Sequence, residues 1–329
     1  MSVTFTEIIG HDRPVGILRR ALANDALAHA YLFSGEPGIG KRMTALAFAA
    51  ALNCAQPRAD GDACGTCPSC RKIASGNHPD VHVMAADGDE IKIDQVREVQ
   101  ATLFLRPFEG RRKVLIVDGA EAMNEASSNA FLKTLEEPPG ESLIILVTAM
   151  PQSLLATIRS RCQALAFQPL PRSVLAPVLR ERRGLGEEDA WFLAALSRGS
   201  IGRALEMDLE EERSARERFR TLMDGVAGLT PDEVLSLAEG VAKDREGFER
   251  LIEIGIEWLR DRIVLAETGD EQLLVSPAAV ERATGGDAHR VPARMLRDLE
   301  LFASSRSLLE RRVSPQLVAE NLFLKLGRD

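Results

Sequence analysis

The chain has 329 residues, of which 45% are hydrophobic and 27% are charged, and its formal net charge is −8 at pH 7. The length predicts two or three domains, and the composition is that of a globular protein. The acidic balance argues against a free-standing binder of duplex DNA, and a single Tyr argues against an aromatic platform for single strands. No basic segment followed by an apolar one opens the chain and no apolar run reaches membrane-spanning length, so we expect a cytoplasmic protein.

The first half of the chain alternates strand-like and helix-like segments. Apolar runs predict strands over residues 30–34, 81–84, 113–118, 143–148 and 164–167. Between them, helices are expected from Lys41 to Asn53, from an N-cap at Asp94, over 124–137, and up to about Arg161. This alternation predicts a doubly wound parallel sheet. After a boundary near Pro169–Pro171 the strand signals stop, and the remainder reads as helices.

Residues 35–41 read GEPGIGK and lie between a predicted strand and a predicted helix. This is the context of a phosphate-binding loop, in which Gly35, Gly38 and Gly40 let backbone N–H groups surround a phosphate and Lys41 reaches its outer oxygens. The alternative is a Gly-rich turn without a ligand. The next residue of such a loop is normally Ser or Thr, whose hydroxyl binds Mg²⁺, whereas this chain has Arg42.

The strand over 113–118 ends in Asp118, as the second half of a nucleotide site requires. In an active site a Glu usually follows and activates the attacking water, but here the next residue is Gly119. Glu121 lies farther along and is expected to face elsewhere. We therefore expect no hydrolysis, and leave open whether ATP or ADP binds.

Four cysteines follow the predicted first helix with the spacing C-x9-C-x2-C-x2-C. Four thiolates at this spacing suit a closed tetrahedral Zn²⁺ site with a structural role, formed by Cys54, Cys64, Cys67 and Cys70. An iron–sulfur cluster and a redox-active Cys-x-x-Cys pair are the alternatives. Cys162 is far away in the sequence and is expected to pack as a small apolar residue.

Several of these segments resemble one protein family. The cysteine module followed by HPDVHVM, the segment HAYLFSG before the loop, NAFLKTLEEPP at 129–139 and Ser-Arg-Cys at 160–162 are similar to the DnaX-like and delta-prime subunits of bacterial DNA polymerase III. The resemblance is strong over about residues 5–168. It implies an AAA+ P-loop domain over 1–168 with a zinc module at about 54–70, a helical lid over 169–208, and an all-α collar domain for oligomerisation over 209–329.

In that family the hydrolysing gamma/tau subunits carry Thr or Ser after the loop Lys and a Glu after the strand Asp. Arg42 and Gly119 instead resemble the delta-prime branch. The resemblance implies a stator in a clamp loader with gamma/tau and delta subunits, which places the beta sliding clamp on primed DNA. The alternatives are an active gamma/tau-type ATPase and a stand-alone zinc-ribbon module that binds nucleic acid.

The resemblance also assigns roles to three further residues. Arg161 of the Ser-Arg-Cys motif is implied to be an arginine finger that acts in trans on a neighbouring gamma/tau site, whereas without the family it reads as an ordinary cation at a helix C-terminus. Thr148 and Arg203 occupy places similar to the family's two sensor positions. The basic run at 111–113 is expected to be a solvated turn or a weak contact to DNA phosphates.

Overall fold

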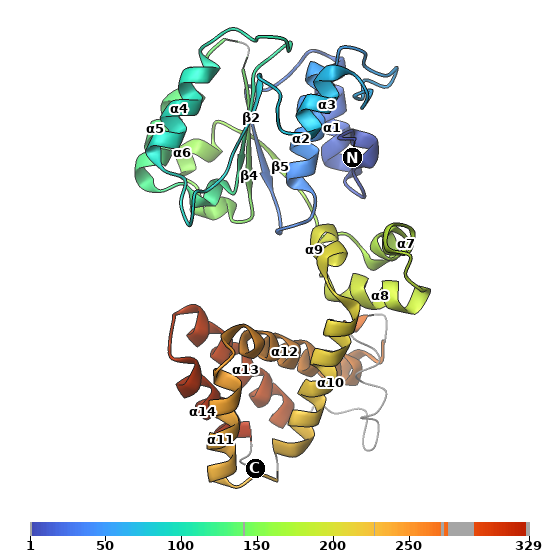
Figure 1. Ribbon diagram of the computed structural model, residues 1–329, viewed down its shortest axis with the longest axis vertical. Coiled ribbons are helices and arrows are strands. Elements are labelled where there is room, and N and C mark those ends of the chain that lie inside the picture. Colours follow the sequence, from blue (N-terminus) through green and yellow to red (C-terminus); the bar gives the residue numbers. More distant parts are fainter. Residues whose placement is uncertain (1, 141, 227, 271–272, 276–292, 327–329) are drawn as a thin grey trace. The chain divides into compact units, whose positions relative to one another are not determined.

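A computed structural model describes residues 2–140, 142–226, 228–270, 273–275 and 293–326 of the protein (Figure 1). The chain forms two compact units. Unit 1 comprises Met1–Val178 and Ser197–Leu205, and unit 2 comprises Leu179–Leu196 and Glu206–Asp329. The predicted division into a P-loop domain, a lid and a collar stays a prediction. Within the described residues, no helix has the length and apolar character needed to cross a membrane.

Unit 1 is built on a five-stranded sheet in which every pairing is parallel, with the strand order β2-β3-β4-β1-β5. This confirms the predicted parallel α/β fold. The central strands are continuous runs of Val, Ile and Leu because both faces of the sheet are covered by helices. The strands are β1 (Ala30–Ser34), β2 (Val81–Met84), β3 (Val114–Asp118), β4 (Leu143–Thr148) and β5 (Gln163–Ala166).

Helices cover the two faces of the sheet and enclose two apolar cores. In Figure 1, α1, α2 and α3 lie on one side of the sheet and α4, α5 and α6 on the other. Phe33 and Phe48 are fully buried in the first core, and Phe131 is buried in the second. The helices are α1 (Asp12–Ala23), α2 (Lys41–Asn53), α3 (Pro68–Ala74), α4 (Ile93–Leu103), α5 (Glu125–Glu136) and α6 (Ala156–Arg159), with short 3₁₀ turns η1 (Phe5–Glu7), η2 (Ala120–Ala122) and η3 (Pro151–Ser153).

Several predicted boundaries, among them those of the strand at 113–118 and the helix at 124–137, differ from the structure by one or two residues. Two further differences concern the start of α4 and the limits of the last strand. Asp94 is not an N-cap, because α4 begins at Ile93 and Lys92 holds the cap position, where its backbone N–H donates to the Gln95 side chain at 2.9 Å. The last strand covers residues 163–166 rather than 164–167, although Phe167 N–H still donates to Ser34 O at 2.8 Å. Both differences are small shifts at element ends.

Beyond the sheet, every regular element among the described residues is a helix, as predicted. In unit 2, Phe248, Phe302 and Phe323 are buried in one apolar core. Gly255 lets α12 and α13 approach closely, since a Cβ at this position would lie 2.4 Å from the Phe302 ring. The helices are α7 (Arg172–Arg183), α8 (Glu187–Leu196), α9 (Ile201–Glu206), α10 (Leu209–Val226), α11 (Pro231–Ala242), α12 (Arg245–Thr268), α13 (Ala293–Glu310) and α14 (Pro315–Leu326).

Candidate functional site

The Gly-rich loop lies at the carboxyl edge of the sheet, between β1 and α2. Ser34 at the end of β1 is paired with Thr148 at the end of β4, and Asp118 at the end of β3 is paired with Val147. The register therefore brings Gly35, Lys41, Asp118 and Thr148 to one edge, where ligands bind in open α/β sheets. The structure thus groups the residues that the sequence assigned to a nucleotide site.

The Lys41 side chain is turned onto its own loop. Its Nζ donates to Gly35 O at 2.6 Å and to Glu36 O at 2.7 Å, and the residue is only 6% exposed. Burial lowers the pKa of Lys41, while the carboxylates of Glu121, Asp118 and Glu36 act in the opposite direction. In this structure the lysine therefore closes the loop on itself.

Arg42 forms an ion pair with the carboxylate at the end of β3. Its Nη1 lies 3.3 Å from Asp118 Oδ2, and both side chains are partly exposed. A surface pair of this kind adds little stability. Its consequence is electrostatic, because a guanidinium already neutralises the carboxylate that would attract a divalent cation, and Arg offers no lone pair as a metal ligand.

The expectation that Glu121 faces elsewhere is wrong. Gly119 adopts a left-handed conformation with φ 74°, and the single turn η2 that follows brings the Glu121 carboxylate back over the carboxyl edge. Glu121 Oε1 accepts a hydrogen bond from Ala149 N–H at 3.1 Å, while its buried Oε2 has no hydrogen-bond partner among the described residues. Among the carboxylates that raise the pKa of Lys41, Glu121 has the largest effect.

The start of α9 packs against the Gly-rich loop. Gly202 N–H donates to Gly38 O at 2.8 Å, and Arg203 N–H donates to Ser200 Oγ at 3.2 Å. The backbone of Arg203 therefore lies beside the loop, and its sensor-like role stays a prediction. Thr148 is 1% exposed, and its hydroxyl accepts from Met150 N–H at 3.0 Å, so this side chain caps its own turn.

Arg161 lies apart from all of these residues. It follows α6 and precedes β5, so it is at the amino edge of the parallel sheet, opposite the Gly-rich loop. The four residues of β5 alone separate the two edges by about 10 Å. Its Nη1 donates to Thr157 O at 2.9 Å and its Nη2 donates to Glu136 Oε1 at 2.8 Å, and its side chain is 35% exposed. The pairing with Glu136 had no signal in the sequence.

The four predicted cysteines converge between α2 and α3. Their Sγ atoms all lie within 4.8 Å of one another, with separations of 3.6 Å for Cys54–Cys70 and 3.9 Å for Cys54–Cys67 and Cys64–Cys70. Four sulfurs around Zn²⁺ at the usual bond length form a tetrahedron with edges of about 3.8 Å. The donor set therefore fits Zn²⁺ in both chemistry and size.

Backbone groups stabilise the thiolate of Cys64. Cys64 Sγ accepts from the N–H groups of Thr66 at 3.4 Å and Cys67 at 3.2 Å, and these bonds lower the pKa of Cys64 to about 6. Cys162 instead packs against the second sheet core, and burial raises its pKa to about 11. It is a packed thiol, as predicted.

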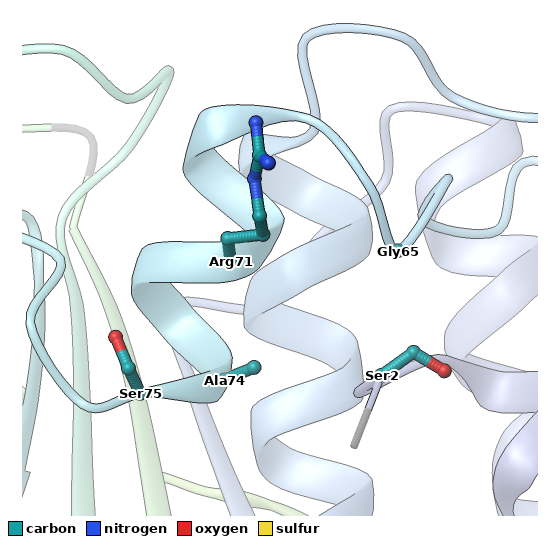
Figure 2. Close-up of a pocket in the computed structure, with 5 residues that line it drawn as sticks. All are labelled: Ser2, Gly65, Arg71, Ala74 and Ser75. Atoms are coloured by element: carbon teal, nitrogen blue, oxygen red, sulfur yellow. The ribbon is translucent and has the colours of Figure 1, made fainter.

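A small surface pocket beside the module is lined by Ser2, Gly65, Arg71, Ala74 and Ser75 (Figure 2).

Buried polar residues next to this module were missed by the sequence analysis. The basic run at 111–113 is not simply solvated, because Lys113 is buried and its Nζ lies 3.3 Å from the buried carboxylate of Asp80. Asn53 and His78 are also buried and hydrogen-bonded. No periodicity distinguishes these residues, since their partners are distant in the sequence.

Comparisons with known proteins agree with the geometry. The family model described as DNA polymerase III, delta subunit matches residues 10–171. The chain is 39% identical over 209 residues to DNA polymerase III subunit delta' of Pseudomonas aeruginosa, which is 63% of this chain and 63% of the relative. It is 36% identical over 200 residues to subunit delta' of Bacillus subtilis, which is 61% of this chain and 60% of the relative. The chain belongs to the DNA polymerase III delta-prime family.

The chain is also similar in sequence to a second group of DNA polymerase III subunits. DNA polymerase III subunit tau of Salmonella typhimurium is 32% identical over 322 residues, which is 91% of this chain and 49% of the relative. The matched segments thus span less than two thirds of each of these three relatives. Membership in the delta-prime family rests on the family model over residues 10–171 and on the two delta' relatives.

Proposed function

We propose that this chain is the delta-prime subunit of a bacterial clamp loader, a stator that does not hydrolyse ATP itself. It works with gamma/tau and delta subunits to place a sliding clamp on primed DNA. In this role the chain supplies Arg161 to the nucleotide of a neighbouring gamma/tau subunit. The delta' relatives support the assignment to a clamp loader.

The position of Arg161 is the observation that carries this proposal. The guanidinium lies at the amino edge of the sheet, on the other side from the chain's own loop, so it does not serve its own nucleotide site. It is held at the surface by Thr157 O and Glu136, with other N–H donors of the fork left to meet an incoming phosphate. A guanidinium that stabilises transition-state charge in trans raises the rate by roughly 10³–10⁵ in the best cases.

The nucleotide edge supports the second part of the proposal. Lys41 is bound to loop carbonyls, Arg42 neutralises Asp118, and a glycine follows the strand Asp where hydrolysing sites place a Glu. These features oppose Mg²⁺ binding and water activation in the same site. We propose that the loop, if it binds ATP or ADP, binds it without hydrolysis.

The Cys₄ module is proposed to hold a structural Zn²⁺. Four protein ligands leave no position for a substrate water, so the ion supplies folding stability rather than chemistry. Its ligands Cys54, Cys64, Cys67 and Cys70 tie the segment between α2 and α3 into the first core of unit 1.

The test is a clamp loader reconstituted from this chain with gamma/tau and delta subunits of the same source. We expect Arg161→Ala to leave assembly intact and to lower ATP turnover of the complex at least tenfold. Arg159→Ala is the matched control, because Arg159 ends the same short helix and is exposed. Equal activity of the Arg161→Ala complex and the wild-type complex would refute the trans role, and equal losses in both variants would indicate a general effect of charge at the helix end.

An active gamma/tau-type ATPase is the second candidate, favoured by the match to subunit tau over 91% of this chain. It predicts Mg²⁺-dependent ATP turnover by the isolated chain, abolished in Lys41→Ala. We expect no such turnover in the purified wild-type protein.

A further inference from the structure

One loop of unit 1 exposes an unusual amount of apolar surface. In the segment 104–112, which we name the apolar loop, Phe104 is 69% exposed, Leu105 is 66% exposed and Phe108 is 83% exposed. The loop begins where α4 ends and leads into β3. Such side chains are ordinarily buried. We therefore asked which contacts hold the backbone of this loop in place.

The second half of the apolar loop, residues 108–112, is fixed by two buried polar side chains. The Asp80 carboxylate, which is fully buried, accepts from the N–H groups of Phe108 at 2.8 Å, Glu109 at 2.9 Å and Gly110 at 2.7 Å. Asn53 Oδ1 accepts from the N–H groups of the next two residues, 111 and 112, at 2.8 and 3.0 Å. Five consecutive backbone donors are thus satisfied by two side chains.

Both of these side chains are connected to the cysteine module. Asn53 directly precedes the ligand Cys54. Asp80 is reached through a chain of hydrogen bonds from Ser69, the residue before the ligand Cys70. Ser69 Oγ donates to Asn53 O at 2.8 Å and lies 3.0 Å from His78 Nε2, while His78 Nδ1 accepts from Asp80 N–H at 3.1 Å.

The protonation of this chain of bonds is determined by its geometry. Because a backbone N–H points at His78 Nδ1, that nitrogen carries no proton, and the ring proton is on Nε2. Nε2–H then donates to Ser69 Oγ, whose own proton goes to Asn53 O. Burial also lowers the pKa of His78, in agreement with a neutral ring. Each donor in the series has one acceptor.

A second connection runs over the surface. Lys72 on α3 places its Nζ 2.6 Å from Glu109 Oε2 and 2.8 Å from Glu109 Oε1. This pair joins the helix that carries Cys70 to the apolar loop itself. The loop is also close to its anchors by necessity, since a Cβ at Gly110 would lie 2.8 Å from Asn53 Oδ1.

We propose that the cysteine module, with its metal bound, is a brace that holds the apolar loop in place through Asn53, Ser69 and His78. Metal binding fixes Cys54 and Cys70, and therefore the residues beside them, Asn53 and Ser69. Those residues set the positions of the five anchored amides. The exposed position of Phe108, and any contact that it makes, therefore depends on a metal that Phe108 does not touch, whereas Phe104 and Leu105 are held by the last turn of α4.

The first test measures amide hydrogen exchange of the full chain with Zn²⁺ bound and after its removal by a chelator. We expect the amides of Phe108, Glu109 and Gly110 to exchange at least tenfold faster without Zn²⁺, while amides of β4 keep their protection. Faster exchange confined to residues 54–70 would overturn the proposal. A purified protein that takes up no Zn²⁺ and has a protected loop would overturn it as well.

The second test keeps the metal bound and removes the side chains that connect the cysteine module to the loop. It distinguishes the two outcomes even if chelation unfolds all of unit 1. The variant is the double substitution Ser69→Ala with Lys72→Ala, and its matched control is Ser75→Ala with Arg71→Ala. The control residues lie on or next to the same helix, where Figure 2 shows them lining the surface pocket, and Ser75 Oγ bonds only to Lys72 O and Asn77.

With equal Zn²⁺ content in both proteins, we expect the first double variant to exchange the three loop amides about tenfold faster than the control, since a buried donor is left without its acceptor. The same exchange rates in both double variants would overturn the proposal.

Discussion

The buried carboxylate of Asp80 offers a quantitative test of how the first unit is stabilised. Burial acts to raise its pKa, but the N–H groups of Glu109, Gly110 and Phe108, together with Lys113, outweigh burial and lower the pKa from 3.8 to about 2. Each unit of pKa corresponds to about 1.4 kcal/mol, so the ionised carboxylate stabilises the folded state by about 2.5 kcal/mol. The replacement Asp80→Asn removes this charge without changing the shape of the side chain.

We expect Asp80→Asn to lower the free energy of unfolding at pH 7 by about 2.5 kcal/mol. The sign of the pH dependence follows from a folded-state pKa below the unfolded one. The stabilisation is present above about pH 4 and is lost as the pH falls toward 2. The difference between wild type and variant should therefore shrink over this interval to about 0.4 kcal/mol at pH 2, the folded-state pKa, and vanish only below it.

Urea unfolding followed by far-UV circular dichroism from pH 7 to pH 2 measures this difference. Asp87→Asn is the control, because Asp87 is exposed, pairs only with Lys92 at 3.4 Å and should change stability by less than about 0.5 kcal/mol. Trp191 and Trp258 both belong to unit 2, so Trp fluorescence monitors that unit separately. A variant as stable as wild type at pH 7, or a difference that is as large at pH 2 as at pH 7, would refute the reasoning.

Three further outcomes are expected. Arg42→Thr should make ATP binding by the isolated chain at least tenfold tighter in Mg²⁺, measured by titration calorimetry, whereas Mg²⁺ should not tighten binding by wild type. Cys70→Ser should lower the Zn²⁺ content of the purified protein and its thermal midpoint, whereas Cys162→Ser should keep the metal. Gly255→Ala should destabilise unit 2 by about 1–3 kcal/mol in urea followed by Trp fluorescence, because the new Cβ would lie 2.4 Å from Phe302.

The sheet of unit 1 was predictable because its strands are continuous apolar runs bounded by Gly, Pro and Asp. The predicted limits of β1, α2, β2 and β4 agree with the structure. The start of α4 was not predictable from Asp94 as a cap, since the side chain of Gln95 bonds the backbone of Lys92 and favours an earlier start. Capping by a residue three positions later is a weaker signal than Asp before a helix.

The composition of the candidate sites was predictable from spacing, but their surroundings were not. The cysteine spacing predicted four converging thiols, and the structure brings them within 4.8 Å. The location of Glu121 was mispredicted because the left-handed turn at Gly119 reverses the chain within two residues. Asp80, Asn53 and His78 bond to groups up to tens of residues away, and no local pattern reports such bonds.

The glycines of the Gly-rich loop are needed for packing, so the motif alone does not establish that the loop binds a phosphate. Gly35 has φ 149° and a Cβ there would lie 2.5 Å from Phe167 O, and Gly38 has φ 71° and a Cβ there would lie 2.4 Å from Ser200 Oγ. Both positions therefore need glycine for the packing of β5 and α9 against the loop, whether or not a phosphate binds. Lys41 likewise serves the loop by bonding Gly35 O.

The two halves of the motif are thus under different physical demands. The glycines and the lysine support the fold at the carboxyl edge, whereas the residue at position 42 matters chiefly for the metal. An Arg there is compatible with every packing contact of the loop and adds a pair with Asp118. Because the shape of the loop does not depend on its chemistry, the sheet that positions Arg161 at the opposite edge is the same whether or not the chain's own site binds Mg²⁺.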